Sequence, residues 1–250
     1  MNNMYKKHFL FFLTIVFFIL SLSSLGFAET KKRSGTYKGK NKSGSYESTI
    51  SKNKTNSTKN TTWQNDQGGT GTRTSEKSWN KDTKTGEFSS NTSLANGKST
   101  SSEGTVKKND DGSITKEGTF TNAKGETSTF ESNKSQNDDG SFTVTKNITK
   151  SDGETIDINK NIEKTDSGYQ VNGEYSTSSG KSGSFSDDIT INNDTITKDL
   201  NVTNQNGQTR NKTVEITKDD NTITREVTKT NPEGVTNSSE QSITITTSGN

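Results

Sequence analysis

The chain has 250 residues, of which 21% are hydrophobic and 25% are charged, and its formal net charge is +2. Ordinary globular domains are about 45–50% apolar even with glycine counted, so this composition excludes a thick hydrophobic core. There is no cysteine, and the only histidine (His8) and both methionines (Met1 and Met4) lie within the first 28 residues. The rest of the chain therefore lacks the usual residues for histidine or cysteine catalysis and for zinc, copper or iron sites.

Residues 1–28 have the features of a secretory signal peptide. Lys6 and Lys7 precede an apolar run from Leu10 to Leu20, and Gly26 and Ala28 supply small residues for cleavage before Glu29. An uncleaved anchor is the alternative, but the run is shorter than the about 20 residues of a bilayer span. We expect a protein that is secreted, or retained in the periplasm or cell envelope, with no transmembrane helix after cleavage.

Residues 29–68 are predicted to be a basic, polar leader. Residues 35–46 are compatible with a degenerate hairpin, and residues 51–62 are typical of a linker. A solvated leader is favoured, because Tyr37 and Tyr46 are the only aromatic residues interleaved with the positive charges; binding of an anionic glycan, lipid head group or nucleic acid is the alternative. The basic residues are Lys31, Lys32, Arg33, Lys38, Lys40, Lys42, Lys52, Lys54 and Lys59.

Residues 69–250 contain a repeat marked by regularly spaced glycines. The glycines recur every 27 or 28 residues, and a second series at Gly112, Gly140 and Gly168 runs half a period out of phase. A period of this size indicates an array of similar supersecondary units. The first series consists of Gly97, Gly125, Gly153, Gly180, Gly207 and Gly234.

The segments between these glycines alternate with a period of two, which is typical of half-buried strands. Ile114, Lys116, Gly118 and Phe120 share one face of such a segment, while threonines occupy most positions between them. Four-residue connections such as residues 122–125 place glycine last, as a type I turn closed by a left-handed residue requires. Two strands per repeat, with tight reversals at both ends, predict antiparallel neighbours.

The predicted fold is therefore all-β, a repetitive antiparallel hairpin meander of 27–28 residues per two-stranded repeat. A β-solenoid and a largely disordered chain are the alternatives. Whether the repeats close, coil or stay open is left undetermined. An outer-membrane barrel is not expected, because Lys116, Lys146, Lys198 and Arg225 interrupt the apolar stripe.

No catalytic, cofactor-binding or metal-binding residue is predicted. Acidic pairs at residues 110–111, 138–139 and 219–220 are compatible with calcium ligands, but aspartate also belongs in hairpin turns, and that interpretation is favoured. Threonine triplets, as at residues 70–74, are attributed to β-propensity on an exposed face. Trp63 and Trp79 are interpreted as caps of a small core, with carbohydrate platforms as the alternative.

Residues 70–80, 121–127 and 204–209 resemble the Thr/Gly hairpin repeats of uncharacterised exported bacterial proteins. The resemblance covers roughly residues 69–247 and implies an exported repeat protein, but no activity and no catalytic residue.

From these observations we expect a non-enzymatic exported protein whose repeated surface has a structural, matrix or adhesive role. A glycan- or anionic-polymer-binding module and a fibril-forming secreted assembly are the alternatives. The partners expected are an envelope or extracellular polysaccharide, or further copies of the chain, whereas nucleic acid is not favoured.

Overall fold

A computed structural model describes residues 29–39 and 42–246, so the predicted signal peptide lies outside the described residues. Within these ranges the chain forms strands joined by turns, and no helix there has the length and hydropathy to cross a membrane. The strands are β1 (Glu29–Gly39), β2 (Lys42–Lys52), β3 (Asn56–Asn65), β4 (Thr70–Ser78), β5 (Thr85–Ser93), β6 (Ser99–Lys108), β7 (Ile114–Thr121), β8 (Thr127–Gln136), β9 (Phe142–Thr149), β10 (Thr155–Thr165), β11 (Gly168–Thr177), β12 (Ser182–Asn192), β13 (Thr195–Asn204), β14 (Thr209–Asp219), β15 (Thr222–Thr230) and β16 (Thr236–Thr246).

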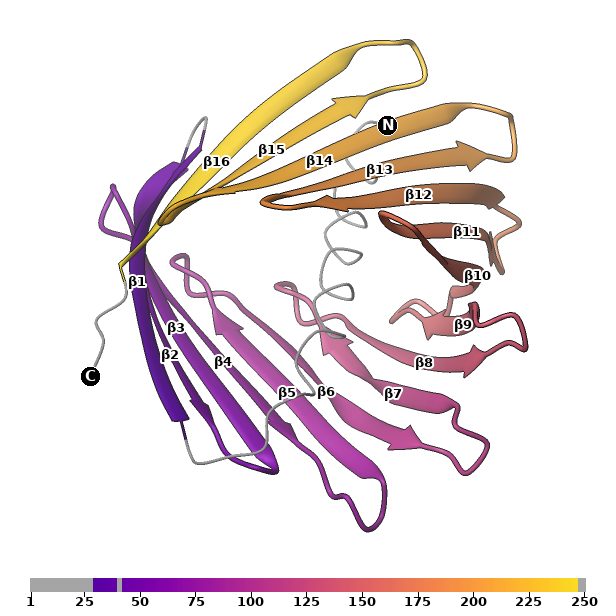
Figure 1. The fold of residues 1–250 in the computed structure, drawn as a ribbon, viewed down its shortest axis with the longest axis horizontal. Coiled ribbons are helices and arrows are strands. Elements are labelled where there is room, and N and C mark those ends of the chain that lie inside the picture. Colours follow the sequence, from indigo (N-terminus) through magenta and orange to yellow (C-terminus); the bar gives the residue numbers. More distant parts are fainter. Residues whose placement is uncertain (1–28, 40–41, 247–250) are drawn as a thin grey trace.

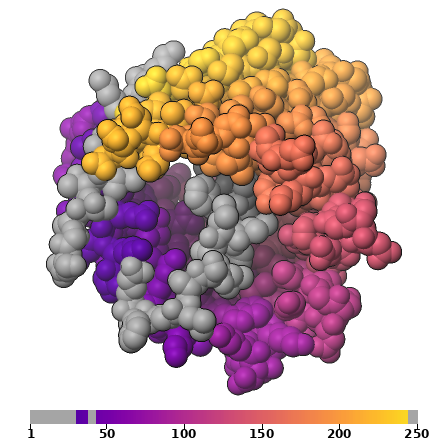
Figure 2. All heavy atoms as spheres, viewed as in Figure 1, coloured from indigo at the N-terminus to yellow at the C-terminus, as the bar shows by residue number. Residues whose placement is uncertain are grey.

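The strands form one closed barrel in which every strand pairs with its neighbours in the chain (Figure 1). All pairings are antiparallel, and β1 closes the ring against β16 with Gly35 opposite Ile245. The indigo and yellow ends of the array accordingly adjoin in Figure 2. The predicted antiparallel meander is confirmed. The solenoid alternative is wrong, because the chain reverses at each turn instead of advancing in coils.

Most reversals follow the turn pattern that the sequence indicates. Gly125 has φ +83°, and its amide donates to the carbonyl of Asn122 across a distance of 2.9 Å. The side-chain Oδ1 of Asn122 also accepts from the amide of Lys124 at 2.8 Å. Asn193 and Asp220 take the left-handed conformation in the shorter turns, with φ of 42° and 47°. Glycine, asparagine and aspartate thus set the positions at which the chain reverses.

The basic segment before residue 69 is part of the same barrel. Residues 29–39 and 42–52 form the hairpin β1–β2, and β3 pairs with β4 across residues 66–69. Residues 51–62, expected to be a linker, instead contain the end of β2 and most of β3. The linker prediction fails because a segment with few apolar residues is held by its pairing with both neighbours.

The two faces of the barrel wall differ in burial. Residues directly opposite each other in antiparallel strands point to the same face, so the pairing register assigns every strand residue to one of two faces. The most buried strand residues, including Ile158, Val171, Val214 and Val227, all belong to one face. Residues on the other face are mainly Thr, Ser, Asn and acidic, and are more exposed.

The more buried face is the concave, inner one. The ring centroids of Phe88 on β5 and Phe130 on β8 lie 6.3 Å apart. Three strand-to-strand steps separate them, or about 14 Å across a flat sheet. Gly104 and Gly118 occupy the positions between them, and a side chain at either would collide with backbone atoms. The two rings therefore approach each other above Gly104 and Gly118, as side chains on the concave side of a curved sheet do.

Candidate functional site

Charge is segregated between the two faces of the wall. Among strand residues whose side chains the structure describes, the inner face carries eighteen basic residues and one carboxylate, Asp187. The outer face carries fifteen carboxylates and two basic residues, Lys32 and Lys107. The inner basic residues are Lys31, Arg33, Lys52, Lys59, Arg73, Lys77, Lys108, Lys116, Lys134, Lys146, Lys160, Lys164, Lys198, Arg210, Lys212, Lys218, Arg225 and Lys229.

This arrangement is costly for folding, because like charges share a partly dehydrated space. Burial, with Lys116 and Lys160 nearby, lowers the pKa of Lys146 to about 8. Burial, with Arg225, Lys229 and Lys198 nearby, lowers the pKa of Lys212 to about 8 as well. Alternating positive and negative side chains on this face would attract one another and stabilise the fold. The inner surface instead has a positive potential, which favours an anionic occupant.

Aromatic rings accompany the inner lysines. Lys116 Nζ lies 4.2 Å from the ring centroid of Phe88 and 5.6 Å from that of Phe130. Lys134 Nζ lies 3.8 Å from the ring centroid of Phe142. Cation–π contacts of this kind hold an ammonium group without neutralising it. The inner wall therefore combines positive charge with apolar ring surface.

Asp187 on β12 is the exception on the inner face. Its Oδ2 accepts a charge-assisted hydrogen bond from Lys198 Nζ on β13. Only 7% of Asp187 is exposed, and its Oδ1 is buried without a hydrogen-bond partner. Its negative charge favours the charged forms of Lys160 and Lys212, whose pKa values it raises against the stronger effect of burial. Asp187 thus offsets the repulsion among the surrounding cations.

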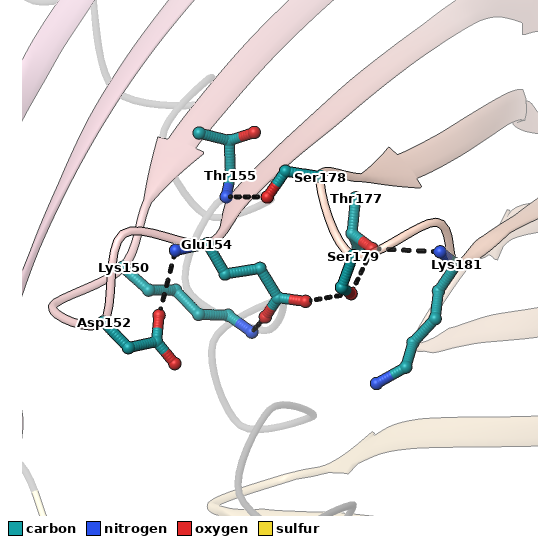
Figure 3. Close-up of polar contacts among 8 residues, drawn as sticks. All are labelled: Lys150, Asp152, Glu154, Thr155, Thr177, Ser178, Ser179 and Lys181. Carbon is teal, nitrogen blue, oxygen red and sulfur yellow. Dashed lines mark hydrogen bonds and ion pairs between the residues drawn. The ribbon is translucent and has the colours of Figure 1, made fainter.

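A group of hydroxyl, lysine and carboxylate side chains joins the β9–β10 turn to the β11–β12 turn (Figure 3). Glu154 in the β9–β10 turn forms an ion pair with Lys150 and accepts from Ser179 Oγ of the β11–β12 turn at 2.5 Å. Ser178 Oγ accepts from the amide of Thr155 at 3.0 Å. These hydrogen bonds, with Lys150 and Ser179 foremost, lower the pKa of Glu154, which makes it a weaker base. The group is suited to joining two turns.

Five of the six aspartates in the acidic pairs lie in turns, and the sixth, Asp219, is the last residue of β14. Asp111 Oδ1 accepts from the amide of Ser113, and Asp139 Oδ1 accepts from that of Ser141, each at 2.9 Å. The hydroxyl and amide of the same serine lower the pKa of each aspartate. Within residues 29–39 and 42–246 no three acidic, histidine or cysteine residues gather as metal ligands would. The local backbone bonding interpretation of these aspartates is confirmed.

The other predicted candidates are divided between the faces. The threonines of residues 70–74 lie on the outer face. Trp63 lies over Gly71, and Trp79 lies beside Gly86, both glycines being on the inner face. The basic segment is split, with Lys31, Arg33, Lys52 and Lys59 inside and Lys32 outside. The site is therefore distributed along the wall and combines residues from nearly every repeat.

Sequence reasoning did not identify this inner wall as a site, although its signal is present in the sequence. Lys116, Lys146 and Lys198 occupy the same alternate positions as the apolar residues, whereas the acidic residues occupy the intervening ones. The side of the sheet that curves inward depends on closure, which this local pattern does not reveal.

The comparisons with known proteins give no relative. No family model, no curated protein and no solved structure matches this chain.

Proposed function

We propose that the protein is an exported, non-enzymatic binding protein whose barrel takes up an anionic polysaccharide or a similar anionic polymer. The observation that carries the proposal is the segregation of charge, with basic and aromatic residues inside and carboxylates outside. Barrels of 16 to 18 strands are wide enough to enclose an aqueous channel. Sugar rings stack on aromatic side chains, and their anionic groups bind to lysine and arginine.

The other functions expected from the sequence find less support in the geometry. A structural or adhesive role rests on the repeated outer surface of hydroxyl and acidic residues, and it stays a prediction. A fibril grown by edge-to-edge pairing needs strands with a free edge. Each of the sixteen described strands has two neighbours, so the closed barrel does not favour that assembly.

The proposal is tested by comparing two polymers that share one backbone. The purified protein is titrated into fluorescein-labelled dextran sulfate and, separately, into labelled neutral dextran, with fluorescence anisotropy as the measurement. We expect saturable binding of dextran sulfate that weakens as salt rises, because screening reduces the attraction. Equal binding of both polymers, or binding of neither, would refute the proposal.

A further inference from the structure

The inner wall of β1–β5 differs from the rest of the lining. Short hydroxyl side chains occupy its centre, at Ser48, Thr61, Ser75 and Ser90, whereas β10, β11, β14 and β15 carry the buried aliphatic residues Ile158, Val171, Val214 and Val227. Ser48 Oγ and Thr61 Oγ1 are hydrogen-bonded at 3.1 Å, and so are Ser75 Oγ and Ser90 Oγ. We name the wall section formed by these four residues the hydroxyl floor.

Three cations surround the hydroxyl floor. The direct pairing Arg33–Ser48–Thr61–Arg73 runs across β1 to β4, so the two arginines stand at either end of the hydrogen-bonded hydroxyl pair. Lys59 lies two residues from Thr61 on the same face of β3, between the arginines. Arg73 Nε donates to Ser90 Oγ at 3.0 Å, which directs its guanidinium toward the Ser75–Ser90 end of the floor.

These cations repel one another. Burial lowers the pKa of Lys59, and the positive charges of Arg73 and Arg33 lower it further. Within the described part of the chain, none of the three forms an ion pair with a carboxylate. All three residues are nonetheless exposed, while Ser48 beneath them is 6% exposed. Accessible cations around a part-buried hydroxyl pair form a site that an oxyanion would complete, because it accepts from guanidinium, ammonium and hydroxyl donors at once.

An aromatic surface adjoins the three cations. Trp63 pairs with Gly71, and its indole lies so close that a Cβ at Gly71 would be 2.4 Å from Cε2 and Cζ2. The hydroxyl of Tyr37 lies 2.7 Å from the position that a Cβ would take at Gly44. The indole of Trp63 thus packs over Gly71 on the inner face, in space that a side chain at Gly71 would occupy. Gly71 is two residues from Arg73 on the same face of β4, so Trp63 and Arg73 lie on the same inner face of the neighbouring strands β3 and β4.

We propose that Trp63 and the Arg33–Lys59–Arg73 group bind one anionic sugar unit. The sugar ring stacks on Trp63, and its sulfate, phosphate or carboxylate group lies between the three cations over Ser48 and Thr61. This assignment rests on the proposed function and gives it a location. A free inorganic anion satisfies the cations but not the indole, so the two parts of the site are separable by experiment.

The experiment uses isothermal titration of the protein with three probes: a sulfated oligosaccharide, its unsulfated parent, and inorganic sulfate. We expect the sulfated oligosaccharide to bind most tightly. The double variant K59Q/R73Q is expected to lose about tenfold or more in affinity for it, equivalent to about 1.4 kcal/mol or more. W63L is expected to lower the affinity for the sulfated oligosaccharide but to leave the affinity for inorganic sulfate unchanged. K107Q, an outward lysine on β6, is the matched control and keeps full affinity.

Several results would overturn the assignment. If K59Q/R73Q binds as tightly as K107Q while K212Q/R225Q loses affinity, binding occurs inside the barrel but at another place, and the proposed function survives without this site. If inorganic sulfate binds as tightly as the oligosaccharide, or if W63L weakens both equally, the sugar is not recognised. If none of the probes binds to the original chain and dextran sulfate does not bind either, both proposals fail together. Circular dichroism of each variant establishes that the barrel is intact.

Discussion

Replacing Asp187 with asparagine tests whether the inner wall is electrostatically strained. Among strand residues whose side chains the structure describes, Asp187 is the one carboxylate on the inner face, and it accepts from Lys198 while lying near Lys160 and Lys212. Asparagine keeps the size of the side chain but removes the negative charge. The surrounding cations then repel one another without compensation, so D187N is expected to unfold more easily.

The magnitude follows from the burial of the pair. Removing one partner of a fully buried ion pair costs about 3–5 kcal/mol. The side chain of Lys198 retains 20% of its exposure, so water screens part of the loss and we expect about 2–4 kcal/mol. For a chain of this size each kcal/mol lowers the melting temperature by about 2–4 °C, which predicts a fall of roughly 5–15 °C.

The assay is thermal and urea unfolding followed by far-ultraviolet circular dichroism. The control is D188N, because Asp188 is the next residue, points outward and accepts from Gln170 Nε2 at 3.1 Å. That surface change is expected to stay within about 0.5 kcal/mol. Adding K198M to D187N should recover part of the stability, since it removes one of the uncompensated cations. Equal stability of D187N and D188N would refute the account of the inner wall.

The remaining predictions concern pH and glycine. Because the pKa of Lys146 is about 8 in the folded chain, against 10.5 when unfolded, folded stability should rise between about pH 8 and 10.5, by up to about 3 kcal/mol from this residue. K146M should flatten that rise in urea midpoints measured across the range, and an unchanged profile would contradict the assignment. G118A should destabilise strongly, because its Cβ would lie 2.2 Å from the carbonyl oxygen of Glu103. In G125A the added Cβ meets open space, but the residue has φ +83°, so this variant should lower the free energy of unfolding by only about 1–2 kcal/mol. Equal melting temperatures for the two alanine variants would show that the close approach of β6 and β7 is not required.

Much of the fold is predictable from local patterns. Residues 114–120 predict both a strand and the division between its faces, and residues 122–125 predict the turn that follows. Each of these features depends on side chains within a few residues of one another. The same local patterns fail for residues 51–62, where few apolar side chains are present and pairing with β2 and β4 determines the structure.

Closure and the site are harder to predict for the same physical reason. The pairing of β1 with β16 joins opposite ends of the chain, and the local sequence of neither strand indicates that the other is its partner. Without closure, Lys116 and Lys146 are simply breaks in an apolar stripe. With closure they line an interior. Trp63 and Arg73 are likewise ordinary strand residues in sequence, and only the register places them on the same face of neighbouring strands.

The way in which β1 meets β16 has a consequence for how such proteins change over evolution. The hairpins share one repeat length, and each contacts only its neighbours. Duplication of a single hairpin would therefore keep the local pairing pattern and still allow the first and last strands to close the barrel. Barrel diameter grows with strand number. Gain or loss of a hairpin would therefore change the diameter of the barrel in whole-hairpin steps without altering the local pattern of the wall.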